Sequence, residues 1–445
     1  MTLLACETLY MRFTTTQVTQ IVDGKINGKD LELDGVTQDS RTVTPGSLFV
    51  PLAAKRDGHD YIDQAVQAGA SAYLTNGKQT TDATSIQVED TASALLSLGA
   101  AARTSIQSPV VGITGSVGKT SVKDLAASVL TQRGLTHSSP RSFNNEIGVP
   151  LTLLNTPEEA TAVITEMGAR HVGDINKLCS IARPDIGVIT TVGAAHTEIF
   201  ESIETVGVTK GEIIENLPAN GCAILNADNQ EVMKQATRTR AQILTFGEKG
   251  EIRASDIELD AELRPSFQIE TPWGREEVSL QVRGKHMIPN ALAASAIGLF
   301  LNMDLSEISV GLSEGTLSPA RMEFQTAYSG LLVINDAYNA NPVSTKAALE
   351  ALASVKKSGR KVAVLGLMAE LGAQSSSAHE EVAEYAHSLE LELLTVGTDL
   401  YGQEPEEDID KSLSDLTDGD VVLIKGSLVA GLQSLAKRLI EDRQV

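Results

Sequence analysis

One stretch of the chain decides how its centre folds: Val110-Val111-Gly112-Ile113-Thr114-Gly115-Ser116-Val117-Gly118-Lys119-Thr120-Ser121. An apolar run that is typical of a buried strand leads into glycines and then into a helical stretch. Glycines let backbone N–H groups turn inward onto phosphate oxygens, and the dipole of the following helix favours an anion there. The stretch therefore predicts a loop that binds the phosphates of a nucleotide.

Two side chains of this loop carry chemistry. Lys119 offers a positive charge to the β- and γ-phosphates, and Thr120 offers a hydroxyl to magnesium. The spacing departs from the strict GxxxxGK[ST] pattern, because Ile113 occupies the first glycine position. The alternative interpretation is an ordinary glycine-rich turn between a strand and a helix. We expect ATP binding by Gly115, Ser116, Val117, Gly118, Lys119, Thr120 and Ser121.

Strands and helices alternate on the C-terminal side of this loop. Further apolar runs at Ala162–Thr165, Ile186–Thr190 and Ala223–Leu225 are separated by helical stretches, which predicts a mostly parallel sheet covered on both faces. Residues 264–283 alternate instead between apolar and polar side chains around Thr271-Pro272-Trp273-Gly274, which predicts an added β-hairpin.

At 445 residues the chain is too long for one hydrophobic core. The first part mixes short strands and helices, as in a small α/β module. The last part has strand candidates at 331–335, 361–365, 393–396 and 421–424, with helices between them. We therefore predict an α/β protein of three domains: a small α/β N-terminal domain (1–107), a central P-loop ATPase-like domain (108–317) and a C-terminal Rossmann-like domain (318–445).

Composition excludes several classes of function. The formal net charge of −22 argues against binding to duplex nucleic acid, which needs a basic face. The three cysteines lie far apart without CxxC spacing, which favours a reduced compartment and no zinc site. We see no convincing signal peptide and no apolar run of about 18 residues, so a cytoplasmic protein without a membrane span is expected.

Polar residues follow two of the predicted strands. Glu166 ends the second strand and His196 follows the third, and the carboxyl ends of parallel strands are where ligands bind. Magnesium takes oxygen ligands, so a carboxylate at this position can serve it. The alternatives are an exposed glutamate and a structural histidine. Lys210, in Val208-Thr209-Lys210-Gly211-Glu212, reads on sequence alone as a solvated lysine on a helix.

Taken together, these segments resemble the Mur ligases, and the set is similar to the branch that appends D-alanyl-D-alanine. The resemblance covers nearly the whole chain, and its phosphate loop has the short Thr-Gly-x-x-Gly-Lys-Thr form of that family. It rests on Asp39-Ser40-Arg41, Gly58-His59-Asp60, the phosphate loop, Asn144-Asn145-Glu146-Ile147-Gly148-Val149-Pro150, Glu166-Met167-Gly168-Ala169-Arg170-His171, Ala195-His196, Lys210-Gly211-Glu212, His286, Asn290-Ala291-Leu292, Arg321-Met322-Glu323, Asp336-Ala337-Tyr338-Asn339-Ala340-Asn341-Pro342, Met368-Ala369-Glu370-Leu371-Gly372 and Lys425-Gly426-Ser427.

The resemblance implies a role for individual residues at the nucleotide. Glu166 and His196 match metal-binding positions beside Thr120, and Lys210 matches a lysine that the family carries as a carbamate. A carbamate replaces a positive amine with anionic oxygens that magnesium accepts. The catalytic set implied is Lys119, His196, Lys210 and Arg321.

Other matches concern the remaining ligands. Asn290 matches an adenine contact, and Arg321 and Asp336 match groups at the γ-phosphate and the ribose. On the substrate side, Asn145 and His171 match the muramoyl-peptide region, and Ser40 and Arg41 match the uridine-diphosphate pocket.

The implied activity is an ATP- and Mg²⁺-dependent ligation of D-alanyl-D-alanine to UDP-N-acetylmuramoyl-tripeptide. The chain has no Asp-Asn-Pro-Arg segment, which the branch adding the third residue uses, and this favours the D-alanyl-D-alanine branch. No segment chooses between diaminopimelate and lysine in the tripeptide. A monomer is expected, although no motif determines the oligomeric state.

Three other functions are compatible with parts of the pattern. The first is a related ligase, either another Mur branch or a folylpolyglutamate synthetase, which tests with other amino acids would separate. The second is a nucleotide-dependent switch, which would bind or slowly hydrolyse the nucleotide without making an amide. The third is a scaffold whose glycines only turn the chain, which predicts no ATP binding.

Overall fold

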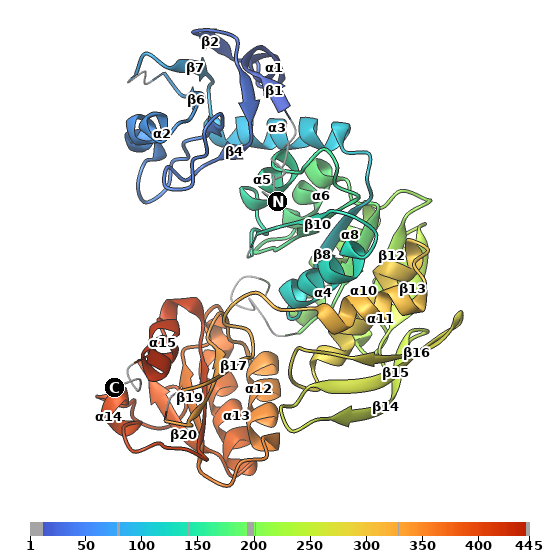
Figure 1. The fold of residues 1–445 in the computed structure, drawn as a ribbon, viewed down its shortest axis with the longest axis vertical. Coiled ribbons are helices and arrows are strands. Elements are labelled where there is room, and N and C mark those ends of the chain that lie inside the picture. The colour runs from blue at the N-terminus through green and yellow to red at the C-terminus, as the bar shows by residue number, and fades with distance from the viewer. Residues whose placement is uncertain are drawn as a thin grey trace, which may run out of the picture.

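The structure of the protein is a computed structural model that describes residues 12–77, 81–140, 142–193, 200, 202–327 and 329–441. Three α/β domains follow one another along the chain, from blue through green and yellow to red in Figure 1. The fold class expected from the sequence is thereby confirmed. The residue boundaries between the domains stay predictions.

The N-terminal domain has a mixed sheet with strand order β2-β7-β6-β5-β4, beside the pair β1-β3. Its strands are β1 (Arg12–Thr14), β2 (Lys25–Asn27), β3 (Glu32–Asp34), β4 (Val36–Thr37), β5 (Leu48–Phe49), β6 (Ala72–Thr75) and β7 (Thr84–Gln87), and its helices are α1 (Thr15–Ile21), η1 (Gly58–Tyr61), α2 (Ile62–Gln67) and α3 (Thr91–Ser105). Helix α3 packs on α5 and α6 of the central domain, so its apolar face joins the two domains.

The central domain is built on a parallel sheet with strand order β13-β12-β11-β8-β10-β9. Its strands are β8 (Val110–Thr114), β9 (Thr136–Ser138), β10 (Ala162–Glu166), β11 (Ile186–Ile189), β12 (Cys222–Asn226) and β13 (Gln242–Phe246). The helices are α4 (Lys119–Thr131), α5 (Gly148–Leu154), α6 (Asp174–Ala182), α8 (Ile203–Glu215), α9 (Gln230–Met233), η2 (Ala236–Arg238), α10 (Met287–Phe300) and α11 (Leu305–Glu314).

Alternate side chains of these strands face opposite layers of helices, as the period of two in a strand requires. Val111 and Ile113 of β8 join the cluster that contains α4 and α10, whereas Val110 joins the cluster that contains α3, α5 and α6. Burial on both faces explains why β8 reads as an uninterrupted apolar run.

The hairpin expected at 264–283 is present, and a third strand that was not predicted extends it. Strands β15 (Pro265–Thr271) and β16 (Gly274–Ser279) pair as predicted, but β14 (Arg253–Leu259) pairs with β15 on its other edge. The prediction missed β14 because its side chains are half-buried or exposed throughout, so no apolar alternation marks it. The hairpin therefore supplies two strands of a three-stranded antiparallel sheet that packs against α10 and α11.

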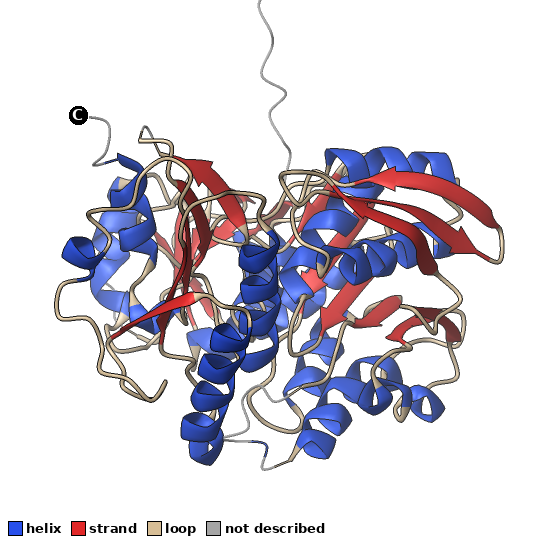
Figure 2. Ribbon diagram, turned by 90° about the horizontal axis from the view of Figure 1, so that it is seen from below, coloured by secondary structure: helices blue, strands red, loops and turns tan. Residues whose placement is uncertain are grey.

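The C-terminal domain has a sheet with strand order β17-β18-β21-β19-β20, in which only β17 is antiparallel to its neighbour. Its strands are β17 (Glu323–Thr326), β18 (Leu332–Asp336), β19 (Lys361–Gly366), β20 (Glu392–Val396) and β21 (Val421–Lys425), and its helices are α12 (Pro342–Ser354), η3 (Gly372–Gln374), α13 (Ser375–Ser388), α14 (Ile409–Ser412), η4 (Leu428–Ala430) and α15 (Gln433–Glu441). Figure 2 shows helices on both sides of these strands. This arrangement confirms the doubly wound expectation.

Two expectations about membrane spans and cysteines can be compared with the described residues. None of the helices in the described part of the chain has the length and apolarity that crossing a membrane requires. Cys179 and Cys222 are buried free thiols, and Cys6 lies outside the described residues.

Candidate functional site

A cleft of about 750 Å³ lies between the central and C-terminal domains. The carboxyl ends of β8, β10 and β11 meet on its central wall, and those of β18, β19 and β21 meet on the opposite wall. In open α/β sheets ligands bind at such strand ends, where the strand order reverses. Strand β8 lies at this point in the central sheet, since its partners β10 and β11 follow it on opposite sides.

The phosphate loop lines this cleft, and two of its glycines are required by geometry. Gly115 has a φ of +145°, and a Cβ there would lie 2.0 Å from Oγ1 of Thr190. Gly118 has a φ of +87°, and a Cβ would lie 2.6 Å from Oδ1 of Asn290. Ser116 fixes the loop further, because its N–H donates to the Thr191 carbonyl at 2.8 Å. These contacts hold the loop against Thr190, Thr191 and Asn290 at the wall of the cleft.

Lys119 is the first residue of α4 and lies half-buried at the cleft. Its ammonium donates to the Gly115 carbonyl at 2.7 Å, so the side chain folds back over the loop. Burial lowers the pKa of Lys119, and the nearby carboxylate of Glu166 opposes that shift. The side chain is placed as a phosphate-binding lysine would be.

Glu166 is the carboxylate at the end of β10, and only 1% of it is exposed. Its Oε2 accepts a hydrogen bond from Thr120 Oγ1 at 2.7 Å, and its Oε1 accepts one from Asn144 Nδ2 at 3.0 Å. The structure thus brings two of the expected metal-binding residues together. Asn144 was quoted in the sequence pattern without a role, and its position beside Glu166 comes only from the fold.

Arg321 reaches the same group of residues from the C-terminal side of the cleft. Its Nη2 donates to Thr120 Oγ1 at 2.9 Å and to Ser142 Oγ at 3.3 Å. Its guanidinium carbon lies 4.4 Å from the centre of the Tyr338 ring, which supports the planar group by a cation–π contact. A positive charge is thereby held over the end of the phosphate loop.

Lys210 does not lie on a solvated helix face. It is 2% exposed and lines the cleft, with its ammonium 5.9 Å from the centre of the Phe200 ring. Within the described part of the chain, no hydrogen bond or ion pair reaches this ammonium. Burial and the nearby charge of Lys119 lower the pKa of Lys210 to about 7. Sequence alone favoured the solvated interpretation, and that interpretation is wrong.

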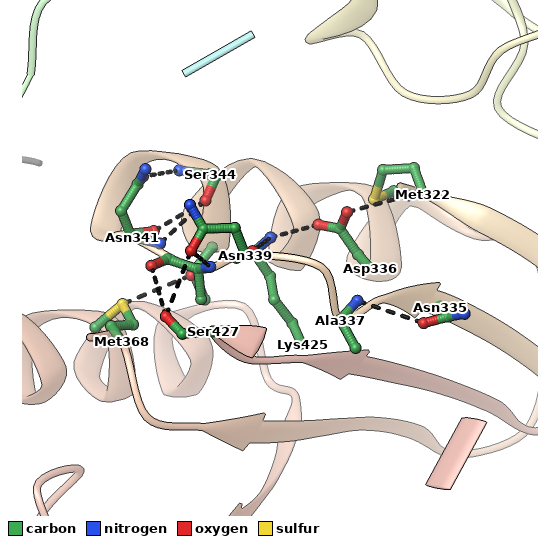
Figure 3. Close-up of polar contacts among 12 residues, drawn as sticks. Met322, Asn335, Asp336, Ala337, Asn339, Asn341, Ser344, Met368, Lys425 and Ser427 are labelled. Atoms are coloured by element: carbon green, nitrogen blue, oxygen red, sulfur yellow. Dashed lines mark hydrogen bonds and ion pairs between the residues drawn. The ribbon is translucent and has the colours of Figure 1, made fainter. Parts of the chain in front are cut away.

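The other expected nucleotide contacts also line the cleft. Asn290 stands against Gly118 on the central wall. Asp336 ends β18, and its carboxylate is held by the N–H of Met322 at 3.1 Å and by the ammonium of Lys425 (Figure 3). Asp336 and Lys425 are register partners on neighbouring strands, which places this buried ion pair on one face of the sheet. Lys425 was part of the sequence pattern but had been given no role.

Figure 3 also shows how the loop after β18 is fixed. Lys425 donates to the Asn339 carbonyl at 3.0 Å, and Asn341 caps α12 by accepting from Ser344 N–H at 2.9 Å. Ser427 accepts from the N–H of Ala369 at 2.9 Å. Lys425 and Ser427 thus hold the segments Asp336–Pro342 and Met368–Gly372 together at one wall of the cleft.

The expected substrate residues fall into two groups. Asn145 and His171 line the cleft, where both are exposed. Ser40 and Arg41 lie in the N-terminal domain and do not line it. Ser40 donates to Gln64 Oε1 at 3.0 Å, and Arg41, whose side chain is 80% exposed, pairs with Asp39 at 2.6 Å.

The expected metal ligand His196 lies outside the described residues. Among those that are described, no cluster of three or more His, Cys, Asp and Glu side chains is placed to hold a metal. Glu166 with the Thr120 hydroxyl is nevertheless a suitable donor set for magnesium, which binds through one or two carboxylates and takes its remaining ligands from phosphate and water.

The sequence of the chain matches models of known protein families. Family models match three successive segments: "Mur ligase family, catalytic domain" over residues 32–106, "Mur ligase middle domain" over 113–298 and "Mur ligase, glutamate ligase domain" over 320–428.

Individual relatives match almost the full length. The UDP-N-acetylmuramoyl-tripeptide--D-alanyl-D-alanine ligase of Escherichia coli (strain K12) is 36% identical over 96% of this chain and 98% of its own. A crystal structure of MurF from Acinetobacter baumannii superposes with a TM-score of 0.87 at 29% identity, over 97% of this chain and 100% of its own. MurF ligase from Thermotoga maritima in complex with ADP gives a TM-score of 0.80 at 29% identity, over 92% and 98%. The sequence and the fold both match, and the chain belongs to the Mur ligase family.

Proposed function

We propose that this protein is an ATP-dependent ligase that joins D-alanyl-D-alanine to UDP-N-acetylmuramoyl-tripeptide, giving the pentapeptide precursor of peptidoglycan, ADP and phosphate. The observation that carries the proposal is the meeting of the phosphate loop, Glu166 and Arg321 in one cleft. The full-length similarity to the E. coli ligase supports the choice of substrates.

The chemistry requires an activated acyl group, because a carboxylate is a poor electrophile towards an amine. A carboxylate oxygen of the tripeptide attacks the γ-phosphorus of ATP, and ADP leaves. The dipeptide nitrogen then attacks the carbonyl carbon of this acyl phosphate, phosphate leaves and the nitrogen loses its proton. Lys119 and Arg321 neutralise charge on the phosphates and orient them, which is the main work of a protein in phosphoryl transfer.

Magnesium fits the donors that the cleft offers. Glu166 and Thr120 would hold it, with His196 as a further candidate, and when bound it neutralises phosphate charge. Lys210 would join this set as a carbamate. Its burial and its pKa of about 7 supply the neutral amine that reaction with carbon dioxide requires.

The proposal is tested by mass spectrometry of products from ATP, UDP-muramoyl tripeptide and candidate amines. We expect the pentapeptide from D-alanyl-D-alanine, and no product when ATP is omitted. Parallel reactions with the diaminopimelate and lysine tripeptides show which one is used. A product only with single amino acids or glutamate would point to another branch of the family, and nucleotide hydrolysis without an amide would refute ligation. The same preparation checks the expected monomer by its mass in solution.

Replacing Arg41 tests the expected uridine-diphosphate pocket. Arg41→Ala should raise the KM for the UDP-linked substrate roughly 10- to 100-fold, since a hydrogen bond to a charged group contributes about 1.5–3 kcal/mol. The KM for ATP should stay unchanged, because Arg41 lies outside the cleft. Lys25→Ala, on the exposed strand β2 of the same domain, is the control. Equal changes in both KM values would count against the pocket.

A further inference from the structure

The linker between the central and C-terminal domains, residues 315–322 between α11 and β17, is attached to α4, the helix that follows the phosphate loop. The N–H of Ser318 donates to Asp124 Oδ2 at 2.7 Å, and the Ser318 hydroxyl donates to Asp124 Oδ1 at 3.2 Å. The Asp124 side chain is 13% exposed, and its Oδ1 lies 3.2 Å from the ammonium of Lys123. A mostly buried carboxylate with these partners has little freedom to move.

Together with Arg321, these contacts close a ring with the first turn of α4, next to the phosphate loop. Asp124 lies one turn beyond Thr120 on α4, and Ser318 precedes Arg321 by three residues. Arg321 then returns to α4 by donating to Thr120 Oγ1 at 2.9 Å. The position of the Arg321 guanidinium therefore depends on the attachment of Ser318 to Asp124 as well as on the C-terminal domain.

The backbone on either side of Arg321 is in an unusual conformation. Ala320 has a φ of +58° and Met322 a φ of +46°, a region that residues with side chains rarely adopt. The surroundings impose it, since the Tyr338 N–H donates to the Ala320 carbonyl at 3.3 Å and the Met322 N–H donates to Asp336 at 3.1 Å. Strained backbone of this kind persists only where neighbouring contacts determine it. Loss of the contact between Asp124 and Ser318 would let the linker relax and would move Arg321 away from Thr120.

We propose that Asp124 is a positioning residue for the ligation: by holding Ser318 it fixes the linker so that Arg321 reaches the transferring phosphate. The inference rests on the proposed function, because it gives Arg321 its task at the γ-phosphate. Asp124 itself touches no reactant; it acts through the linker.

The test is a kinetic comparison of Asp124→Ala with the wild-type enzyme. We expect kcat to fall roughly 10- to 100-fold, the effect of displacing a catalytic group by about 1 Å, with little change in the KM of any of the three substrates. Ser128→Ala is the matched control. Ser128 lies one turn further along α4 and donates to the Gly311 carbonyl of α11 at 2.7 Å, so its loss removes a comparable contact that does not lead to the linker. This control should keep its kcat.

A double-mutant cycle separates positioning from general stability. If Asp124 acts through Arg321, Asp124→Ala combined with Arg321→Ala should be no slower than Arg321→Ala alone. Asp124→Asn retains an oxygen for the Ser318 N–H and should recover part of kcat; it also serves if the alanine variant does not fold. Normal turnover of both Asp124 variants, or a double variant slower by the product of the two losses, would overturn the inference. A wild-type enzyme that forms no amide would instead remove the proposed function itself, and the inference with it.

Discussion

A Lys119→Ala variant is expected to lose roughly 10³-fold in ligation rate, at least as much as the loss of one preorganised charge-stabilising donor costs other enzymes. The ammonium faces the cleft, and its hydrogen bond within the described structure goes to the Gly115 carbonyl of its own loop. The side chain is half-buried at the wall of the cleft, so its removal should take away phosphate contacts and leave the apolar core intact. The thermal midpoint of unfolding should therefore stay close to that of the wild type.

The measurement pairs product formation with thermal unfolding followed by circular dichroism. Lys249→Ala, an exposed lysine in the turn after β13, is the control and should retain both activity and stability. Near-normal turnover of a folded Lys119→Ala protein would contradict the phosphate-loop interpretation. A variant that fails to fold would show that the lysine has a structural role not visible in its contacts.

The second large effect is expected at Lys210. As a free ammonium this side chain would repel magnesium, whereas as a carbamate it would present anionic oxygens to it. Lys210→Ala should abolish ligation, and added formate or acetate should partly restore it, because the position needs a negatively charged oxygen more than a covalent attachment. Lys210→Arg keeps a positive charge and fills the space, so it should be inactive and should not be rescued.

The pH dependence at this position has a definite sign. With the pKa of Lys210 lowered to about 7, the neutral amine that attacks carbon dioxide becomes scarce below pH 7, so carbamate formation should fall as pH falls. Between pH 7 and the usual lysine pKa of about 10.4 the unfolded chain binds more protons at this side chain than the folded chain. The contribution of the uncarbamylated lysine to the free energy of unfolding therefore rises with pH across that range. A fully active Lys210→Ala enzyme would contradict the proposed carbamate.

Features of the fold that are encoded in consecutive residues could be predicted from the sequence. The phosphate loop could be predicted because its strand, its glycines and the start of α4 are consecutive. The parallel strands β10, β11 and β12 were found for the same reason, since burial on both faces makes each of them an apolar run. Edge strands such as β9, whose residues are all half-buried, give no comparable pattern and were missed.

The parts of the site that escaped prediction depend on contacts between distant segments. The hydrogen bond from Arg321 to Thr120 joins residues that are 201 positions apart. Lys210 is buried by neighbours such as Phe200 and by the packing of α8. The residues of its own helix do not predict this burial. The resemblance to the family pointed to these residues, but their physical environment became visible only in the fold.

The attachment of Ser318 to Asp124 affects the effective concentration of the Arg321 guanidinium at the phosphate loop. Arg321 is tethered to the phosphate loop by the chain, so its encounter with Thr120 is intramolecular, and its effective concentration depends on the length of the free tether. Attachment of Ser318 to α4 shortens that tether to the residues after Ser318. The short tether thus keeps the guanidinium at high local concentration beside Thr120 at the end of the phosphate loop.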